Sequence, residues 1–181
     1  MKRFILTGPP GAGKTSILYA LKGEGYDVVE EAATAVIAEK QALGIDKPWL
    51  SPDFVRDIVQ LQQLRLKQTN DNPHGLQFHD RSIIDTYILG QYLGHGIPQE
   101  IENLVSLLVR GRVYEKRVFF VESLGFMENT AARQISLAEA LEFGKLHERV
   151  YTALGFHCIK ISPRPVQDRA REIMGLVNTR S

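Results

Sequence analysis

The sequence is poor in three features that each point to a particular class of protein. It has a single cysteine, Cys158, so no disulfide can form within the chain and nothing requires an oxidising compartment. No apolar run approaches the roughly 18 residues of a membrane-spanning helix, and the run at residues 4–6 is too short for the core of a signal peptide. With 22 Lys and Arg against 21 Asp and Glu, neither sign of charge dominates, so no nucleic-acid partner is expected.

The rest of the composition is ordinary for a globular protein. Hydrophobic residues make up 44% of the 181 residues and charged residues 24%, which is enough apolar surface to bury one core. We therefore expect a soluble, cytoplasmic protein that folds as a single domain over residues 1–181 and has no contact with a membrane. Composition leaves the oligomeric state open.

Short apolar runs alternate with longer amphipathic segments along the whole chain. We predict strands near residues 4–7, 26–29, 76–79, 117–121 and 158–161. We predict helices near residues 14–21, 31–42, 52–69, 85–93, 98–108, 136–154 and 166–177. Because strands that alternate with helices connect through right-handed crossovers, this pattern predicts a three-layer α/β/α fold around a five-stranded parallel sheet.

The segment after the first predicted strand carries the clearest motif. Residues 8–15 fit the phosphate-loop pattern G-x-x-x-x-G-K-[ST] at every fixed position, between a predicted strand and a predicted helix. Glycines let the backbone N–H groups surround a phosphate, and the following helix adds its positive end. The predicted nucleotide-binding residues are Gly8, Pro9, Pro10, Gly11, Ala12, Gly13, Lys14, Thr15 and Ser16. Among them, Lys14 is expected at the β- and γ-phosphates and Thr15 at Mg²⁺.

The sequence has no Asn-Lys-x-Asp segment that would read guanine, and only about twenty residues follow the last predicted strand, too few for the helical lid domain of a hexameric motor. These absences favour an ATP-dependent kinase that acts on a small molecule. The alternative is a regulatory ATPase or GTPase, or a nucleotide-dependent binding module, without such kinase activity.

Two acidic positions follow predicted strands and are candidates for the reaction. Asp80 ends the strand at residues 76–79, so it is expected in the ligand crevice, where it can hold Mg²⁺ or polarise an acceptor hydroxyl. Its alternative role is that Asp80 or Ser82 simply caps the next helix. Glu31, preferred over Glu30, can orient or deprotonate the acceptor, although an acidic residue at a helix start is also favoured by the helix dipole.

Basic residues near the fourth strand are candidates for a lid over the phosphates. The predicted lid covers residues 123–135, with Arg133 as its main cation and Arg112 as second choice among Arg110, Arg112, Lys116 and Arg133. Glu122, at the end of that strand, is an alternative acidic residue of the ATPase kind. Trp49 either forms a wall of the substrate pocket or packs in a loop.

Several segments together resemble a known family. They are the phosphate loop, the Val-Val-Glu-Glu-Ala-Ala-Thr run at residues 28–34, His79-Asp80-Arg81-Ser82, and the Arg133 region before a long helix that ends near Gly155. Over nearly its whole length the chain resembles the small AAA-type, kinase-like P-loop family that includes the ribosylnicotinamide-kinase domain of bacterial NAD regulators. The resemblance implies a nucleoside- or nucleotide-kinase-like fold with strand order 2-3-1-4-5.

The segment Asp80-Arg81-Ser82 also resembles the Asp/Glu-Arg-Ser element of deoxynucleoside kinases. That likeness implies that Arg81 meets phosphates and that a carboxylate lies near the acceptor. The resulting prediction is an ATP- and Mg²⁺-dependent kinase for a small, nucleoside-like acceptor. Lys14 and an Mg²⁺ held by Thr15 and Asp80 would neutralise charge, Glu31 or Asp80 would orient the acceptor, and Arg81 and Arg133 would close over the phosphoryl group.

Overall fold

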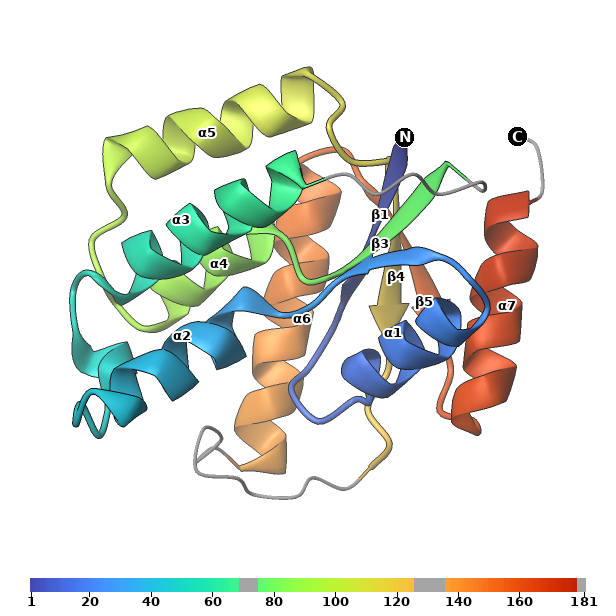
Figure 1. The fold of residues 1–181 in the computed structure, drawn as a ribbon, viewed down its shortest axis with the longest axis horizontal. Coiled ribbons are helices and arrows are strands. Elements are labelled where there is room, and N and C mark those ends of the chain that lie inside the picture. The colour runs from blue at the N-terminus through green and yellow to red at the C-terminus, as the bar shows by residue number, and fades with distance from the viewer. Residues whose placement is uncertain (69–74, 126–135, 179–181) are drawn as a thin grey trace.

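The computed structural model describes residues 1–68, 75–125 and 136–178. Within these ranges, parallel strands form one five-stranded sheet in the order β2-β3-β1-β4-β5 (Figure 1). The strands are β1 (Lys2–Thr7), β2 (Asp27–Val29), β3 (Leu76–Asp80), β4 (Arg117–Val121) and β5 (His157–Ile161). The arrangement confirms the predicted α/β fold and the strand order that the family resemblance implies.

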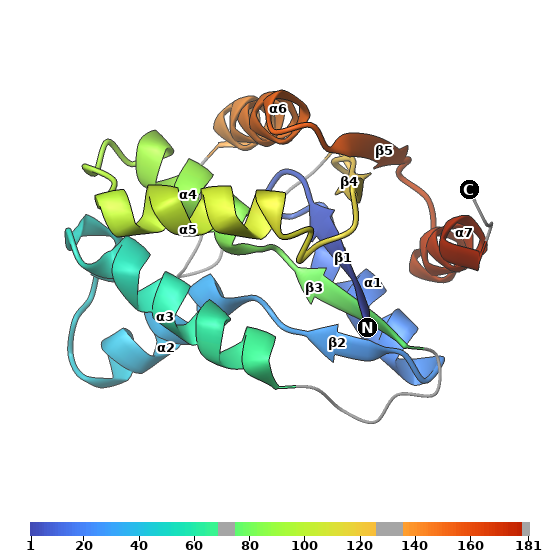
Figure 2. The ribbon, with the colours of Figure 1, turned by 90° about the horizontal axis from the view of Figure 1, so that it is seen from above.

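Helices cover both faces of this sheet (Figure 2). On one face, α1 (Lys14–Gly23) and α7 (Val166–Asn178) pack against each other. On the other face lie α3 (Phe54–Lys67), α4 (Ile83–Tyr92), α5 (Gln99–Arg110) and α6 (Leu137–Ala153), with α2 (Ala32–Ala42) packed against α3. A short 3₁₀ helix, Pro48–Leu50, lies in the segment between α2 and α3 for which a loop is predicted.

The alternation of side chains along β1 explains why a separate core forms on each face of the sheet. Phe4 and Leu6 point into the core beneath α1 and α7, whereas Ile5 points into the core beneath α3 to α6. All three side chains are fully buried. Since side chains on a strand alternate between the faces of a sheet, a central strand covered on both sides must be apolar throughout, as β1 is.

Two helices begin with reciprocal side-chain caps. The predicted capping box at Ser136 and Glu139 is present at the start of α6. A second capping box, formed by Ser82 and Asp85, starts α4 at Ile83, two residues earlier than predicted. Of the two residues proposed as alternative caps there, Ser82 is the one that caps, which leaves Asp80 free for another role.

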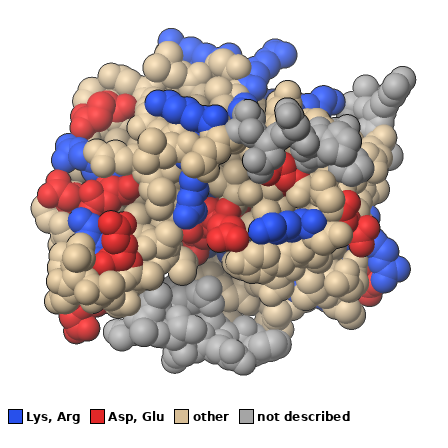
Figure 3. All heavy atoms as spheres, viewed as in Figure 1, with Lys and Arg blue, Asp and Glu red and all other residues tan. Residues whose placement is uncertain are grey.

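The connections of the sheet bring three chain segments to one edge. Since all strands are parallel, the ends of β1, β2 and β3 lead into the phosphate loop, Glu31 and Arg81 on the same side of the molecule. On the face shown in Figure 3, basic and acidic side chains lie interspersed. None of the described helices combines the length and apolar character that a bilayer-spanning segment needs.

Because His79 in β3 is buried, we expect the protein to lose stability in acid. Its ring is 3% exposed and lies 2.9 Å from Gln77 Oε1 through Nε2. Burial, followed by the charge of Arg3, lowers the pKa of His79 to about 3. As the pH falls below about 6.5, His79 binds a proton in the unfolded chain but stays neutral in the folded chain, so protonation favours unfolding.

Between about pH 6.5 and pH 5, we expect the free energy of unfolding of the wild type to fall by about 1.5 kcal/mol more than that of the variant His79→Asn. Urea denaturation at each pH measures this difference. Stability profiles that run parallel for the two proteins over this interval would contradict the assignment.

Candidate nucleotide and acceptor site

The phosphate loop joins the carboxyl end of β1 to α1, and two of its glycines are required by geometry. Gly8 has a φ of 128°, and a Cβ at this position would lie 2.4 Å from the carbonyl oxygen of Val121. Gly13, directly before α1, has a φ of 83°. Because side chains are disfavoured in such conformations, the loop can bring its backbone N–H groups close to an anion only with glycine at these positions.

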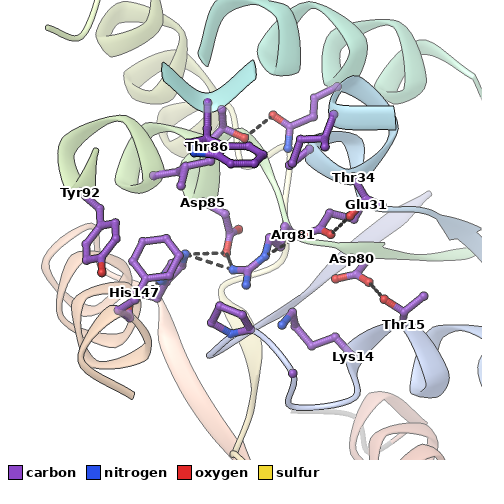
Figure 4. A pocket seen from close by; sticks show the side chains of 18 of the residues that line it. Lys14, Thr15, Glu31, Thr34, Asp80, Arg81, Asp85, Thr86, Tyr92 and His147 are labelled. Carbon is purple, nitrogen blue, oxygen red and sulfur yellow. Dashed lines mark hydrogen bonds and ion pairs between the residues drawn. The ribbon is translucent and has the colours of Figure 1, made fainter. Parts of the chain in front are cut away.

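Lys14 is the first residue of α1, and its side chain is buried against the loop (Figure 4). Its Nζ donates hydrogen bonds to the carbonyl oxygens of Pro9, at 2.9 Å, and Gly8, at 3.5 Å. Burial, followed by the positive charge of Arg81, lowers the pKa of Lys14 to about 8. Since these acceptors are carbonyls and not carboxylates, a phosphate can replace them without breaking an ion pair.

Asp80 ends β3, and its carboxylate faces Thr15 (Figure 4). Thr15 Oγ1 donates a 2.6 Å hydrogen bond to Asp80 Oδ2, whereas Oδ1 is buried without a hydrogen-bond partner among the described residues. Burial raises the pKa of Asp80 even though the charge of Lys14 acts against it. A buried oxygen without a partner is costly. A cation or its bound water fits as the missing partner, and Mg²⁺ prefers oxygen ligands of this kind.

Arg81 lies at the centre of the polar network in Figure 4. Its φ of 67° is in the left-handed region, which is uncommon for a residue with a side chain. Nε donates to Glu31 Oε1 at 2.9 Å, and Nη2 donates to the carbonyl oxygen of Gly8 at 3.0 Å. Nη1 lies 3.1 Å from His147 Nε2 and 3.4 Å from Asp85 Oδ1. This backbone conformation thus holds one guanidinium against the loop, the start of α2 and α6.

Asp85 fixes the network from inside α4. Its Oδ1 accepts a hydrogen bond from Thr7 Oγ1 at 2.5 Å. Its Oδ2 accepts from the backbone N–H of Ser82 at 2.8 Å and from the Tyr151 hydroxyl. The carboxylate is buried, yet both oxygens have donors, so it is held in one orientation. Arg81, which contacts Oδ1, is held with it.

His147 completes the network from α6. Its Nδ1 lies 2.8 Å from the carbonyl oxygen of Phe143, which places the ring proton there and leaves Nε2 to accept from Arg81. Burial, followed by the charge of Arg81, lowers the pKa of His147 to about 4. The ring is therefore neutral at neutral pH and can accept a hydrogen bond from a cation.

Glu31 and Glu30 have different surroundings although they are adjacent. Glu31 accepts hydrogen bonds from Arg81 and, at 2.5 Å, from Thr34 Oγ1. Burial alone would raise the pKa of Glu31, but the charges of Arg81 and Lys14 outweigh it and hold this pKa below its usual range. Glu30 is exposed and accepts a 3.2 Å hydrogen bond from the Tyr19 hydroxyl. Of the two, Glu31 is the one that lines the cavity beside the phosphate loop, and it is also the one preferred from the sequence.

A cavity of about 650 Å³ extends from the phosphate loop toward α3, α4 and α6. Beyond Glu31 and Arg81 its wall is mostly apolar and aromatic, formed by Ile37, Trp49, Phe54, Leu89, Tyr92, Leu93 and Phe143. Gln62 and Thr86 add a polar pair to this wall, with Thr86 Oγ1 donating to Gln62 Oε1 at 2.8 Å. The cavity therefore has a charged end at the loop and an apolar end with one amide.

Most residues predicted for the site lie at this cavity. It is lined by Pro10, Gly11, Gly13, Lys14, Thr15, Ser16, Glu31, Asp80 and Arg81, and also by Trp49. Gly8 and Pro9 contribute carbonyl oxygens to Lys14, and Ala12 is buried beneath the loop. Arg133, with residues 126–135 of the predicted lid, lies outside the described residues, so its role stays a prediction.

Arg112, the second candidate for the lid cation, lies at the edge of the sheet opposite the phosphate loop. Arg112 is exposed. It precedes β4 in the chain, as do Arg110 and Lys116. The segment before β4 pairs with the beginning of β1, where the backbone N–H of Glu115 donates to the carbonyl oxygen of Arg3. This is the edge opposite the phosphate loop. Glu122, at the correct edge, contacts β5 through its backbone and is not among the described residues that line the cavity.

Four residues that matter for the geometry are not among those predicted from the sequence: Gln62, Asp85, Thr86 and His147. A signal existed for Asp85, because Ser82 and Asp85 have the spacing of a capping box. The others come from helices whose sequences give no sign of which side chain reaches the site.

Solved structures of other proteins share this fold. A deoxyadenosine kinase from M. mycoides with its products dCMP and dCDP bound matches with a TM-score of 0.66 at 16% identity, over 97% of this chain and 98% of that chain. A NadR protein in complex with NAD and AMP-PNP matches with a TM-score of 0.67 at 14% identity, over 99% of this chain and 50% of that chain. This chain thus spans half the length of the NadR protein. At such identities the likeness establishes the fold alone.

Sequence comparison identifies the family. A search of curated protein sequences gives no match. The family described as AAA domain, however, matches residues 3–169, which is most of the chain and includes the phosphate loop, Glu31, Asp80 and Arg81. By this match, the chain belongs to the AAA domain family.

Proposed function

We propose that this protein is a kinase that uses ATP and Mg²⁺ to phosphorylate a hydroxyl group of a small, nucleoside-like molecule. The position of Glu31 carries the proposal: Arg81 holds its carboxylate between the phosphate loop and an apolar cavity. Hydrolysis of ATP needs only water, whereas this cavity of about 650 Å³ has room for a second small molecule. A deoxyadenosine kinase with bound dATP shares the fold, with a TM-score of 0.65, and supports a nucleoside-like acceptor.

In the proposed phosphoryl transfer, Lys14, Arg81 and Glu31 have different roles. Transfer forms a bond between the acceptor oxygen and the γ-phosphorus and breaks the bond to the β-phosphate oxygen, which leaves with ADP. We assign the neutralisation of phosphate charge to Lys14 and Arg81, which both line the cavity. Glu31, ionised at neutral pH, accepts the hydrogen bond of the acceptor hydroxyl and takes its proton as the new bond forms.

In this proposal Asp80 and Thr15 keep the Mg²⁺ that the sequence predicts for them, and orientation of the acceptor falls to Glu31. They would hold Mg²⁺, which when bound supplies positive charge to the oxygens of the β- and γ-phosphates. The described residues contain no group of three or more His, Cys, Asp or Glu side chains that could enclose a metal ion. In this proposal the other ligands of the ion are water and phosphate oxygens.

The test is an acceptor screen with the purified protein. ATP and Mg²⁺ are combined with a panel of nucleosides, nucleotides and vitamin-derived nucleosides, and both ADP release and phosphorylated product are measured. We expect at least one acceptor to raise ADP release by about tenfold or more over water. Tight nucleotide binding with slow hydrolysis and no phosphorylated product from the whole panel would instead indicate a regulatory ATPase.

Gln62 is expected to determine acceptor affinity. Thr86 holds the carbonyl end of its amide, so the NH₂ end is available to donate to a polar group of the acceptor. Replacing Gln62 by leucine should raise the KM for the acceptor by about 10- to 100-fold, because a polar acceptor group is then buried without its partner. The KM for ATP should change little. Steady-state kinetics with each substrate varied separately measures both constants.

Gln63 provides the matched control, since it is the next residue on α3 and is exposed. The variant Gln63→Leu should keep both KM values. An unchanged acceptor KM in Gln62→Leu, or equal changes in the KM values for acceptor and ATP, would exclude this role for Gln62.

A further inference from the structure

A buried arginine of the last helix contacts the back of the phosphate loop. Arg169 lies near the start of α7, which packs beside α1 (Figures 1 and 2), and is 1% exposed. Its Nη1 donates a 2.7 Å hydrogen bond to the carbonyl oxygen of Ala12. A Cβ built on Gly13 would lie 3.0 Å from Nη2. The guanidinium thus packs directly under the peptide that joins Ala12 and Gly13.

Within residues 1–68, 75–125 and 136–178 this guanidinium lacks the counter-charge that its neighbours have. On the same helix, Arg171 pairs with Asp168, and Glu172 pairs with Arg164. No ion pair within the described parts of the chain includes Arg169. Its Nε is also without a hydrogen-bond partner there. Because a buried charge without compensation is strongly unfavourable, the free protein carries a cost that an anion nearby would remove.

The nearest place for an anion is the opposite face of the same peptide. In a trans peptide the C=O and N–H groups point in opposite directions. The carbonyl of Ala12 points to Arg169, so the N–H of Gly13 points away from it, toward the side of the loop where Gly13 lines the cavity. Donation to the carbonyl also strengthens the N–H as a donor, because hydrogen bonds in a chain polarise one another.

We propose that Arg169 is a positioning residue of the nucleotide site, whose charge is compensated by the polyphosphate of the bound nucleotide on the other side of the loop. It acts through the peptide of Ala12 and Gly13 and does not touch the nucleotide. The inference rests on nucleotide binding at the phosphate loop and is independent of transfer to an acceptor. The contribution of Arg169 therefore grows with phosphate charge, from AMP through ADP to ATP.

The experiment compares Arg169→Met and Arg169→Lys with the wild type. Binding of ATP, ADP and AMP with Mg²⁺ is measured by calorimetry, and thermal unfolding is measured with and without ATP. In Arg169→Met we expect about tenfold or greater loss of ATP affinity, less than about threefold loss for AMP, and recovery of most of the ATP affinity in Arg169→Lys. Without nucleotide, the unfolding temperature of Arg169→Met should equal or exceed that of the wild type, because the unpaired charge is gone.

Arg171→Met is the matched control, an exposed arginine of the same helix, and should bind all three nucleotides as the wild type does. A purely structural role would lower the unfolding temperature of Arg169→Met without nucleotide and leave its ATP-to-AMP affinity ratio unchanged, which would overturn the proposal. If Arg169→Met does not fold, Arg169→Lys is compared with Arg169→Gln, and equal ATP-to-AMP ratios in these two would overturn it. A wild type that binds ATP but phosphorylates no acceptor would refute the proposed kinase function and leave this inference standing.

Discussion

Replacement of Glu31 by glutamine is expected to lower the rate of phosphoryl transfer by about 10²- to 10⁴-fold, with ATP affinity retained. Glutamine keeps the size of the side chain and can still accept from Arg81 through its carbonyl oxygen, but it cannot take a proton from the acceptor hydroxyl. The fold should therefore survive, because the substitution leaves no large cavity. Single-turnover kinetics with the best acceptor from the screen separates this chemical step from nucleotide binding.

Glu30→Gln is the matched control for this experiment. It changes the same side chain at the adjacent position, where the carboxylate is exposed and contacts Tyr19. Wild-type turnover is expected from it. If Glu31→Gln transferred phosphate at the wild-type rate, Glu31 would not be the group that accepts the proton, and Asp80 would become the candidate again.

Replacement of Lys14 by methionine is expected to weaken ATP binding by about 100-fold and to reduce transfer further, to about 10⁻³ of the wild-type rate. The ammonium is the buried cation of the loop, and its hydrogen bonds in the free protein go to two carbonyl oxygens. Methionine fills a similar volume without the charge. Fluorescence titration with a labelled ATP analogue measures the affinity, and thermal unfolding without nucleotide confirms that the variant is folded.

The pH dependence gives Lys14 a second signature. The free protein loses the Lys14 proton at a pKa of about 8, whereas a bound phosphate favours the charged form. Affinity for ATP should therefore fall as the pH rises above about 8 in the wild type, and this fall should be missing in Lys14→Met. Lys22→Met, at the exposed end of α1, should behave as the wild type in both respects. Parallel pH profiles for Lys14→Met and the wild type would show that another group titrates.

The parts of the site that could be predicted are those encoded by neighbouring residues or by strand ends. The phosphate loop is one continuous segment whose glycines and lysine are required by its shape and charge. Asp80 and Glu31 could be placed because the carboxyl ends of parallel strands meet at one edge of the sheet. The same rule, applied to Arg112, shows why that prediction failed: a residue before a strand lies at the opposite edge.

The parts that could not be predicted depend on contacts between distant segments. The hydroxyl of Tyr151 reaches Asp85 across 66 positions of sequence, and His147 and Arg81 meet through the same packing of α6 on α4. In sequence, a histidine on a helix with apolar neighbours resembles any core residue. The buried position of Arg169 could not be predicted either, because an arginine in an amphipathic helix is expected at the surface.

The contact between Arg169 and Ala12 also bears on how the protein is made. These residues are separated by 157 positions, and the close approach of Gly8 to Val121 adds a second long-range constraint on the same loop. During synthesis the phosphate loop emerges from the ribosome before Val121 and Arg169, the two residues that constrain its shape. The nascent chain therefore exposes the complete phosphate-loop sequence before the loop has taken its binding form. Nucleotide capture would then report that α7 has been made, and ATP would stabilise chains that contain α7 in preference to chains truncated before it.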